Sequence, residues 1–172
     1  MKKTGLTILL ALMVTGVSAQ KDPVAVKVLT EFGNRATSAP SVKIDFEITA
    51  YDAQEDDETT MEGTAVIRGD SYRVTLPDNI IMADGKAVWN FMPDVNEVTV
   101  TEPDPADESF LSRPSLLFTM YREGYKIRLL EQTPRDWTID LYPEDLNMNL
   151  VRIRMIIDKK NHDLISAEYR TK

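Results

Sequence analysis

The stretch that decides the fold runs from Gly63 to Val100 and reads GTAVIRGDSYRVTLPDNIIMADGKAVWNFMPDVNEVTV. Apolar residues alternate with polar ones in short segments, and residues typical of tight turns separate these segments. The turns are predicted at Gly69-Asp70, Pro77-Asp78-Asn79, Ala83-Asp84-Gly85 and Pro93-Asp94. Gly, Asn and Asp tolerate a positive φ, and Pro fixes φ near the value that many turns require. The stretch therefore predicts an antiparallel meander.

Further strands are predicted on both sides of this stretch. The clearest spans 42–51, where apolar residues occupy every second position. Three or four more are predicted near the C-terminus, at 125–131, 137–142, 151–158 and 164–169. Two short helices interrupt the strands: an apolar stripe after Pro23 predicts one at 23–33, and Pro114 opens another that ends at Gly124. We therefore predict an α+β fold, a curved antiparallel sheet with short helices on one side.

The N-terminus has the features of a secretory signal peptide. Lys2 and Lys3 precede an uncharged run, and the small residues Val17-Ser18-Ala19 form a cleavage site. The apolar part is far shorter than the ~20 residues that a membrane-spanning helix needs. We therefore predict a signal peptide over 1–19 and a single exported domain over 20–172. Because the chain has no cysteine, it has no thiol for lipid attachment, and we expect a freely moving protein.

The chain without its signal peptide is strongly acidic. Cleavage removes two of the 20 basic residues and none of the 28 acidic ones, which leaves a formal charge of −10. This charge disfavours nucleic acid and anionic membrane surfaces as partners. If the protein handles lipid, we expect it to use a pocket rather than to lie on a bilayer.

Residue types that catalysis or metal binding requires are scarce. The one histidine, His162, lies in the polar turn 161–163, where we expect it to be solvated. Zinc and copper sites therefore lack ligands, and a calcium site at 52–58, although left open, lacks the spacing of an EF-hand. Asp140 lies between two apolar residues, but strand alternation puts it on the polar face and predicts exposure. We predict no enzyme activity, no catalytic residue, no metal and no cofactor.

Several strings of the chain resemble those of one known family. They are SVKIDF at 41–46, RGDSYR at 68–73, DGKAVWNFMP at 84–93, NEVTV at 96–100 and PSLL at 114–117. The string D-G-K-x-x-W-x-F-x-P and the order of the elements around it are similar to those of the periplasmic lipoprotein carrier proteins, the LolA-like family. The resemblance covers nearly the whole chain after the signal peptide.

The resemblance implies an incomplete β-barrel in which helices form a lid over a hydrophobic cavity. It implies a periplasmic carrier that takes lipoproteins from an inner-membrane ABC transporter and delivers their acyl chains to an outer-membrane acceptor. The lipid-binding residues implied in this way are Ile44, Phe46, Ile48, Tyr72, Val74, Trp89 and Phe91 on the sheet, with Leu116, Leu117 and Met120 on the lid. An arginine of the sheet holds the lid closed in this family, and we assign that role to Arg68 rather than Arg73.

The C-terminus departs from the family pattern. Family members usually continue for further strands, whereas this chain ends shortly after the strand at 164–169. An unpaired sheet edge would result, so we expect a monomer but leave open a dimer through that edge. Two alternatives to transport also stay open: a lipid- or lipoprotein-sensing regulatory domain with the same fold, and a protein-interaction module whose packed core leaves no cavity.

Overall fold

The computed structural model describes residues 21–52, 57–104, 107 and 109–172. The predicted signal peptide lies outside the described residues. Along the chain the elements are α1 (Pro23–Ser38), β1 (Val42–Asp52), β2 (Asp57–Arg68), β3 (Ser71–Thr75), β4 (Ile80–Ala83), β5 (Val88–Met92), β6 (Glu97–Thr101), the 3-10 helices η1 (Pro114–Phe118) and η2 (Met120–Arg122), β7 (Tyr125–Gln132), β8 (Asp136–Pro143), β9 (Leu150–Asp158) and β10 (Leu164–Thr171).

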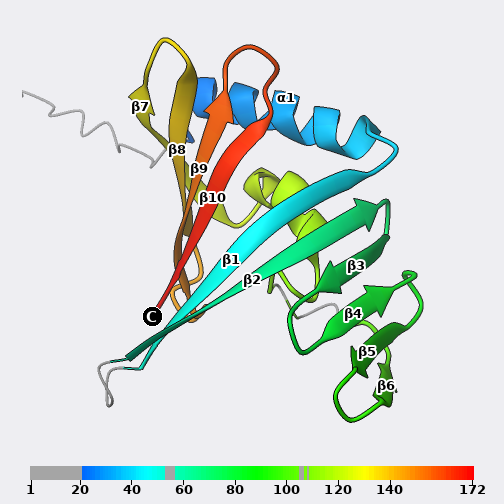
Figure 1. Cartoon of the computed structure of the whole chain (residues 1–172). Helices are drawn as coiled ribbons and strands as arrows, with labels where there is room; N and C mark the ends of the chain where they lie inside the picture. Colours follow the sequence, from blue (N-terminus) through cyan, green and yellow to red (C-terminus); the bar gives the residue numbers. More distant parts are fainter. Residues whose placement is uncertain (1–20, 53–56, 105–106, 108) are drawn as a thin grey trace, which may run out of the picture.

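Strands β1 to β6 form one antiparallel sheet in sequence order, which confirms the predicted meander (Figure 1). Gly69 and Gly85 stand in the turns after β2 and β4 with φ angles of 58° and 85°. A positive φ angle is strained for residues with a Cβ, which explains why glycine occupies both positions. The turn chemistry of the sequence therefore sets the connections of this sheet.

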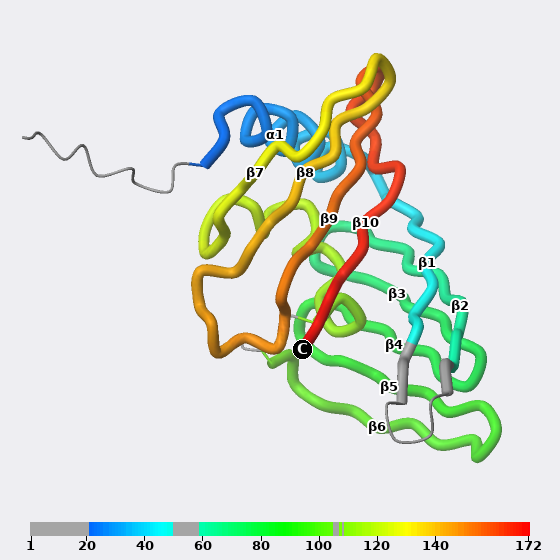
Figure 2. The backbone as a smooth tube through the Cα atoms, turned by 90° about the vertical axis from the view of Figure 1, so that its left-hand side faces the viewer, coloured from blue at the N-terminus to red at the C-terminus, as the bar shows by residue number. Residues whose placement is uncertain are grey.

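Strands β7 to β10 form a second antiparallel sheet, also in sequence order. The α+β class is confirmed, but the prediction of one curved sheet was wrong: the described residues build a six-stranded and a four-stranded antiparallel sheet, neither of which closes or curls. The segment between β6 and β7 contains η1 and η2 instead of a further strand, so the strand pairing ends at β6. In Figures 1 and 2, β10 is the strand of the smaller sheet that lies nearest β1.

The predicted N-terminal helix is present and longer than expected. The carboxylate of Asp22 accepts hydrogen bonds from the backbone N–H groups of Val24 and Ala25 at 2.9 and 3.1 Å, which starts α1. The helix continues past Gly33 to Ser38, because Gly33 packs closely against η1 and η2 and does not end it. The second predicted helix is present as the two short 3-10 turns η1 and η2.

The core lies where the four-stranded sheet meets α1 and the 3-10 helices. Its most completely buried side chains are Leu29 from α1 and Ile139, Leu141, Ile153, Met155 and Ile157 from β8 and β9. The six-stranded sheet adds Ile67 near the end of β2, and Ile44 and Tyr72 pack against the margin of the same core. This arrangement places one face of β1–β3 opposite the 3-10 helices and close to β10.

Candidate functional site

A seam of aromatic side chains joins the two sheets. The ring of Phe110 lies 5.1 Å from that of Phe46 on β1, at an edge-to-face angle of 77°. The same ring lies 6.2 Å from that of Tyr169 on β10. All three side chains are partly buried. Phe110 belongs to neither sheet, so a side chain from the connecting segment fills the space between them.

A hydrogen bond ties the segment that carries Phe110 to β3. The hydroxyl of Tyr72 donates to the backbone carbonyl of Ser112 at 2.6 Å. Burial and, to a smaller extent, the charge of Asp107 raise the pKa of Tyr72. Hydrogen bonds from Ser112 and Ser109 in turn lower the pKa of Asp107. The tyrosine therefore remains protonated, as its role as a donor requires.

The hydroxyl of Tyr169 has a weak partner inside the seam. Its oxygen lies 4.0 Å from the sulfur of Met120, and a thioether is a poor acceptor. Burial raises the pKa of Tyr169. The seam thus combines apolar surface with a neutral donor that an ester or amide oxygen of a ligand could engage.

The structure brings together most of the residues expected on the cavity wall. Strand pairing puts five of them on one face of the six-stranded sheet, namely Ile44, Phe46, Ile48, Tyr72 and Val74. We call this the inner face because Phe46 contacts Phe110 there. Of the predicted lid residues, Leu117 is 2% exposed and belongs to the core, whereas Leu116 and Met120 are partly buried. Their role in binding lipid stays a prediction.

Trp89 and Phe91 lie on the opposite, outer face. Val74, Ile81 and Asn90 are cross-strand neighbours, and residues directly opposite each other in antiparallel strands point to the same side. Asn90 is therefore on the inner face, and its neighbours Trp89 and Phe91 point away from it. The prediction that these two aromatic residues share a face with those of β1 was wrong. Register across three turns decides the face, and a slip of one residue would reverse it.

The contact predicted for Arg68 is not formed. This residue ends β2 on the outer face, where its side chain is exposed and, within the described part of the chain, makes no hydrogen bond or ion pair. The neighbouring Arg73 lies on the same outer face. The contact between the sheet and the Phe110 segment comes from Tyr72, which we had expected only to line the cavity.

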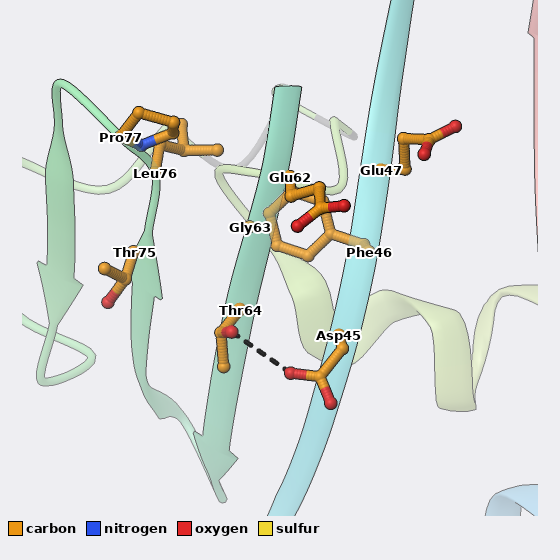
Figure 3. A pocket seen from close by; sticks show the side chains of 9 residues that line it. All are labelled: Asp45, Phe46, Glu47, Glu62, Gly63, Thr64, Thr75, Leu76 and Pro77. Atoms are coloured by element: carbon orange, nitrogen blue, oxygen red, sulfur yellow. Dashed lines mark hydrogen bonds between the residues drawn. The ribbon is translucent and has the colours of Figure 1, made fainter. Parts of the chain in front are cut away.

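Gly63 allows the Phe46 ring to lie across β2. The two residues are directly opposite each other, and a Cβ at position 63 would overlap the ring and crowd Leu76. An open pocket of about 750 Å³ borders this contact, and Figure 3 shows its lining: Asp45, Phe46, Glu47, Glu62, Gly63, Thr64, Thr75, Leu76 and Pro77.

Sequence reasoning missed Phe110 and Tyr169 as site residues. A glycine within an alternating strand was the available signal for the aromatic contact.

Asp140 is buried, contrary to the prediction. It lies on the polar face of β8 as expected, yet its exposed fraction is 0%. Its carboxylate accepts two hydrogen bonds from the Arg154 guanidinium, at 2.8 and 2.9 Å, and one from the Tyr142 hydroxyl at 3.0 Å. The Arg154 contact is the main cause that lowers the pKa of Asp140. Long neighbouring side chains cover the carboxylate, which alternation alone does not reveal.

His162 lies in the turn between β9 and β10, but it is partly buried rather than solvated. Its Nε2 lies 2.6 Å from a carboxylate oxygen of Glu31 on α1, and its ring packs 5.2 Å from that of Trp137. In the same turn, Asp163 pairs with Arg35 of α1 at 2.6 Å. The histidine thus helps to attach the helix to the four-stranded sheet.

The described residues contain no group of three or more His, Asp or Glu side chains placed to hold a metal ion. Most of the calcium segment considered above, 53–56, lies outside them. No helix in the described ranges is long and apolar enough to cross a membrane.

A family comparison agrees with the resemblance seen in the sequence. Residues 17–167 match the model of the outer membrane lipoprotein carrier protein LolA family. Because the match covers most of the chain, the protein belongs to this LolA-like family. No curated protein matches the sequence.

Two solved structures are similar to this chain at low sequence identity. An uncharacterized conserved protein from Thermus thermophilus is 11% identical with a TM-score of 0.50, and the alignment covers 87% of this chain and 78% of that one. A LolA superfamily protein from Nitrosomonas europaea is 15% identical with a TM-score of 0.41, over 86% of this chain and 71% of that one. Of these two, the Thermus thermophilus structure supports the fold of this chain, and it supports the fold alone.

Proposed function

We propose that the protein is a periplasmic carrier that binds the acyl chains of lipoproteins and moves them from the inner to the outer membrane. An inner-membrane ABC transporter would supply the lipoprotein, and an outer-membrane acceptor would receive it. Family membership over residues 17–167 supports this role. Membership of a carrier family also supports a non-enzymatic function.

The seam of Phe46, Phe110 and Tyr169 is the observation that carries the proposal. An acyl chain needs continuous apolar surface that is already formed, and here three aromatic rings from separate parts of the chain meet. Phe110 sits on a connecting segment, and the hydrogen bond from Tyr72 to Ser112 ties that segment to β3. Displacing the Phe110 side chain would open room for a ligand at modest cost, because Phe110 belongs to neither sheet.

The energetics favour partial rather than complete enclosure. Burying about fifteen methylenes would contribute on the order of 12 kcal/mol at ~0.8 kcal/mol each, an upper bound. A carrier that bound so tightly would release its cargo slowly. Partly buried aromatic residues in the seam suit a carrier that must both hold and transfer its ligand.

Fluorescence titration with an apolar probe, followed by displacement with a diacylated lipopeptide, tests the proposal on the chain without residues 1–19. We expect saturable binding that Phe46→Asp weakens at least about tenfold, since a charge in an apolar site costs more than 1.4 kcal/mol. Trp89→Asp is the matched control, because it places the same charge on the outer face of the same sheet. Alanine variants replace any aspartate variant that does not fold.

Binding that survives Phe46→Asp but not Trp89→Asp would move the ligand site to the outer face. A folded chain that binds no probe would contradict the carrier function. In that case a protein-interaction or sensing module with the same fold would be the better explanation.

A further inference from the structure

Four strands end the two sheets, and three of them carry the features that protect a sheet edge. β1 has charged side chains at alternate positions, and β7 and β10 combine charged residues with irregular register. Charges and bulges of this kind prevent the pairing of free backbone groups with another chain. A strand without them is an edge that can accept a partner.

β6 lacks this protection. Its sequence, Glu97–Thr101, contains one acidic residue, no lysine, no arginine and no proline. Its pairing with β5 runs without a bulge, and all five side chains are exposed. Within the described part of the chain, β6 pairs only with β5, and Figures 1 and 2 show it at the end of the sheet. A regular Val-Thr-Val-Thr edge is thus left open.

Two apolar rows on the outer face end at this open edge. One row is Met82, Trp89 and Val100, and the other is Ile80, Phe91 and Val98. The two valines at the ends are 58% and 56% exposed, whereas the residues of β4 and β5 are partly buried. The rows stop at the edge with their last members uncovered on the side where a further strand would lie.

We propose that β6 pairs antiparallel with β6 of a second copy of this chain, centred on Thr99. In this register Val98 of each copy faces Val100 of the other, so both apolar rows continue across the interface for six residues. On the other face Glu97 lies opposite Thr101, so no two like charges are directly opposite. A two-fold symmetric interface requires a surface that is complementary to its own copy. This register meets that requirement, because apolar residues face apolar residues and no like charges are opposite each other.

The other edges of the molecule fit β6 less well. Pairing with β1 would bring Glu97 near a strand that carries Asp45 and Glu47, and the irregular register of β7 and β10 interrupts a continuous ladder. A five-residue strand buries little surface, so the dimer should be reversible and depend on concentration. This inference does not rest on the proposed lipid-binding function.

Site-specific disulfides test the register, because the chain has no native cysteine. Directly opposite residues in antiparallel strands have Cα atoms about 4.5–5.5 Å apart, within the range that a disulfide spans. We expect Thr99→Cys to give a covalent dimer under mild oxidation that a reducing agent reverses. Thr101→Cys is the control: it is exposed on the same strand and face, yet two copies of residue 101 would lie far beyond disulfide reach.

Light scattering over a series of protein concentrations measures the molecular mass in solution and is an independent test. We expect the mass of the purified wild-type protein to rise from one chain towards two. Val100→Lys should keep it at one chain, because the two lysines would face apolar valines at the interface. Val24→Lys is the control, since Val24 is also exposed but lies on α1.

A wild-type mass of one chain at every concentration would overturn the proposal. Equal cross-linking at positions 99 and 101 would also overturn it, because non-specific collision would then explain the disulfide. A Val100→Lys variant that dimerises like the wild type would place the interface elsewhere.

Discussion

The two sheets are built from the same kind of alternating strands, but they bury very different fractions of their side chains. In the four-stranded sheet, β8 and β9 place Ile139, Leu141 and Ile153 in the core against α1 and the 3-10 helices, all at 0% exposure. In the six-stranded sheet, every residue of β6 is exposed and every residue of β5 is partly buried. Strands β8 and β9 therefore bury more apolar surface than strands β5 and β6, and we expect them to contribute more to stability.

The six-stranded sheet also gains a second apolar side along its width. On β1 and β3 the apolar residues Phe46, Ile44 and Val74 lie on the inner face, towards the other sheet. On β5 the aromatic residues Trp89 and Phe91 lie on the outer face. One half of the sheet thus contributes to the seam between the sheets, and the other half presents apolar side chains to the outside.

The largest expected effect comes from truncating the core of the smaller sheet. Leu141→Ala should lower the free energy of unfolding by about 3 kcal/mol, because it leaves a cavity among fully buried side chains. Val98→Ala, in the outer half of the larger sheet, should change it by less than about 0.5 kcal/mol. Urea unfolding followed by circular dichroism measures both values. Equal losses would mean that the two sheets contribute equally to stability.

The next effect concerns the buried carboxylate on the polar face of the smaller sheet. Asp140→Ala should cost about 2 kcal/mol, because it removes charged hydrogen bonds to Arg154 and Tyr142. The cost should stay below that of breaking a fully buried pair, since Arg154 is partly exposed and can be hydrated. Asp45→Ala is the control, because that carboxylate pairs with Lys43 at the surface and should change the unfolding midpoint only slightly.

The same carboxylate gives a pH dependence with a definite sign. Contact with Arg154 lowers the pKa of Asp140 in the folded protein, whereas the unfolded chain keeps a pKa of about 3.9. The unfolded state therefore binds the proton more readily, and the stabilisation is complete above the unfolded value and is lost as the pH falls below it. The difference in stability between wild type and Asp140→Ala should shrink in acid. A difference that stays constant down to the acid transition would contradict this assignment.

The elements of this fold could be predicted from the sequence better than the site could. Strands and turns follow from neighbouring residues, so the meander from 63 to 100 and the helix after Pro23 were predicted correctly. The site depends on contacts between distant residues: Phe46, Phe110 and Tyr169 are more than fifty positions apart. Alternation shows which residues share a side of one strand, but not which side faces the core or what covers a carboxylate such as Asp140.

The smallest expected effect tests the aromatic contact within the larger sheet. Gly63→Ala should cost about 1 kcal/mol, because the added methyl group meets the Phe46 ring, which must then move. In a Phe46→Ala background the same substitution should cost much less, since only the end of the flexible Leu76 side chain still crowds the added methyl group and alanine suits a strand better than glycine. A double-mutant cycle from urea unfolding measures this reduction in cost. Equal costs in both backgrounds would mean that Gly63 is required by the backbone and not by the ring that joins this sheet to the seam.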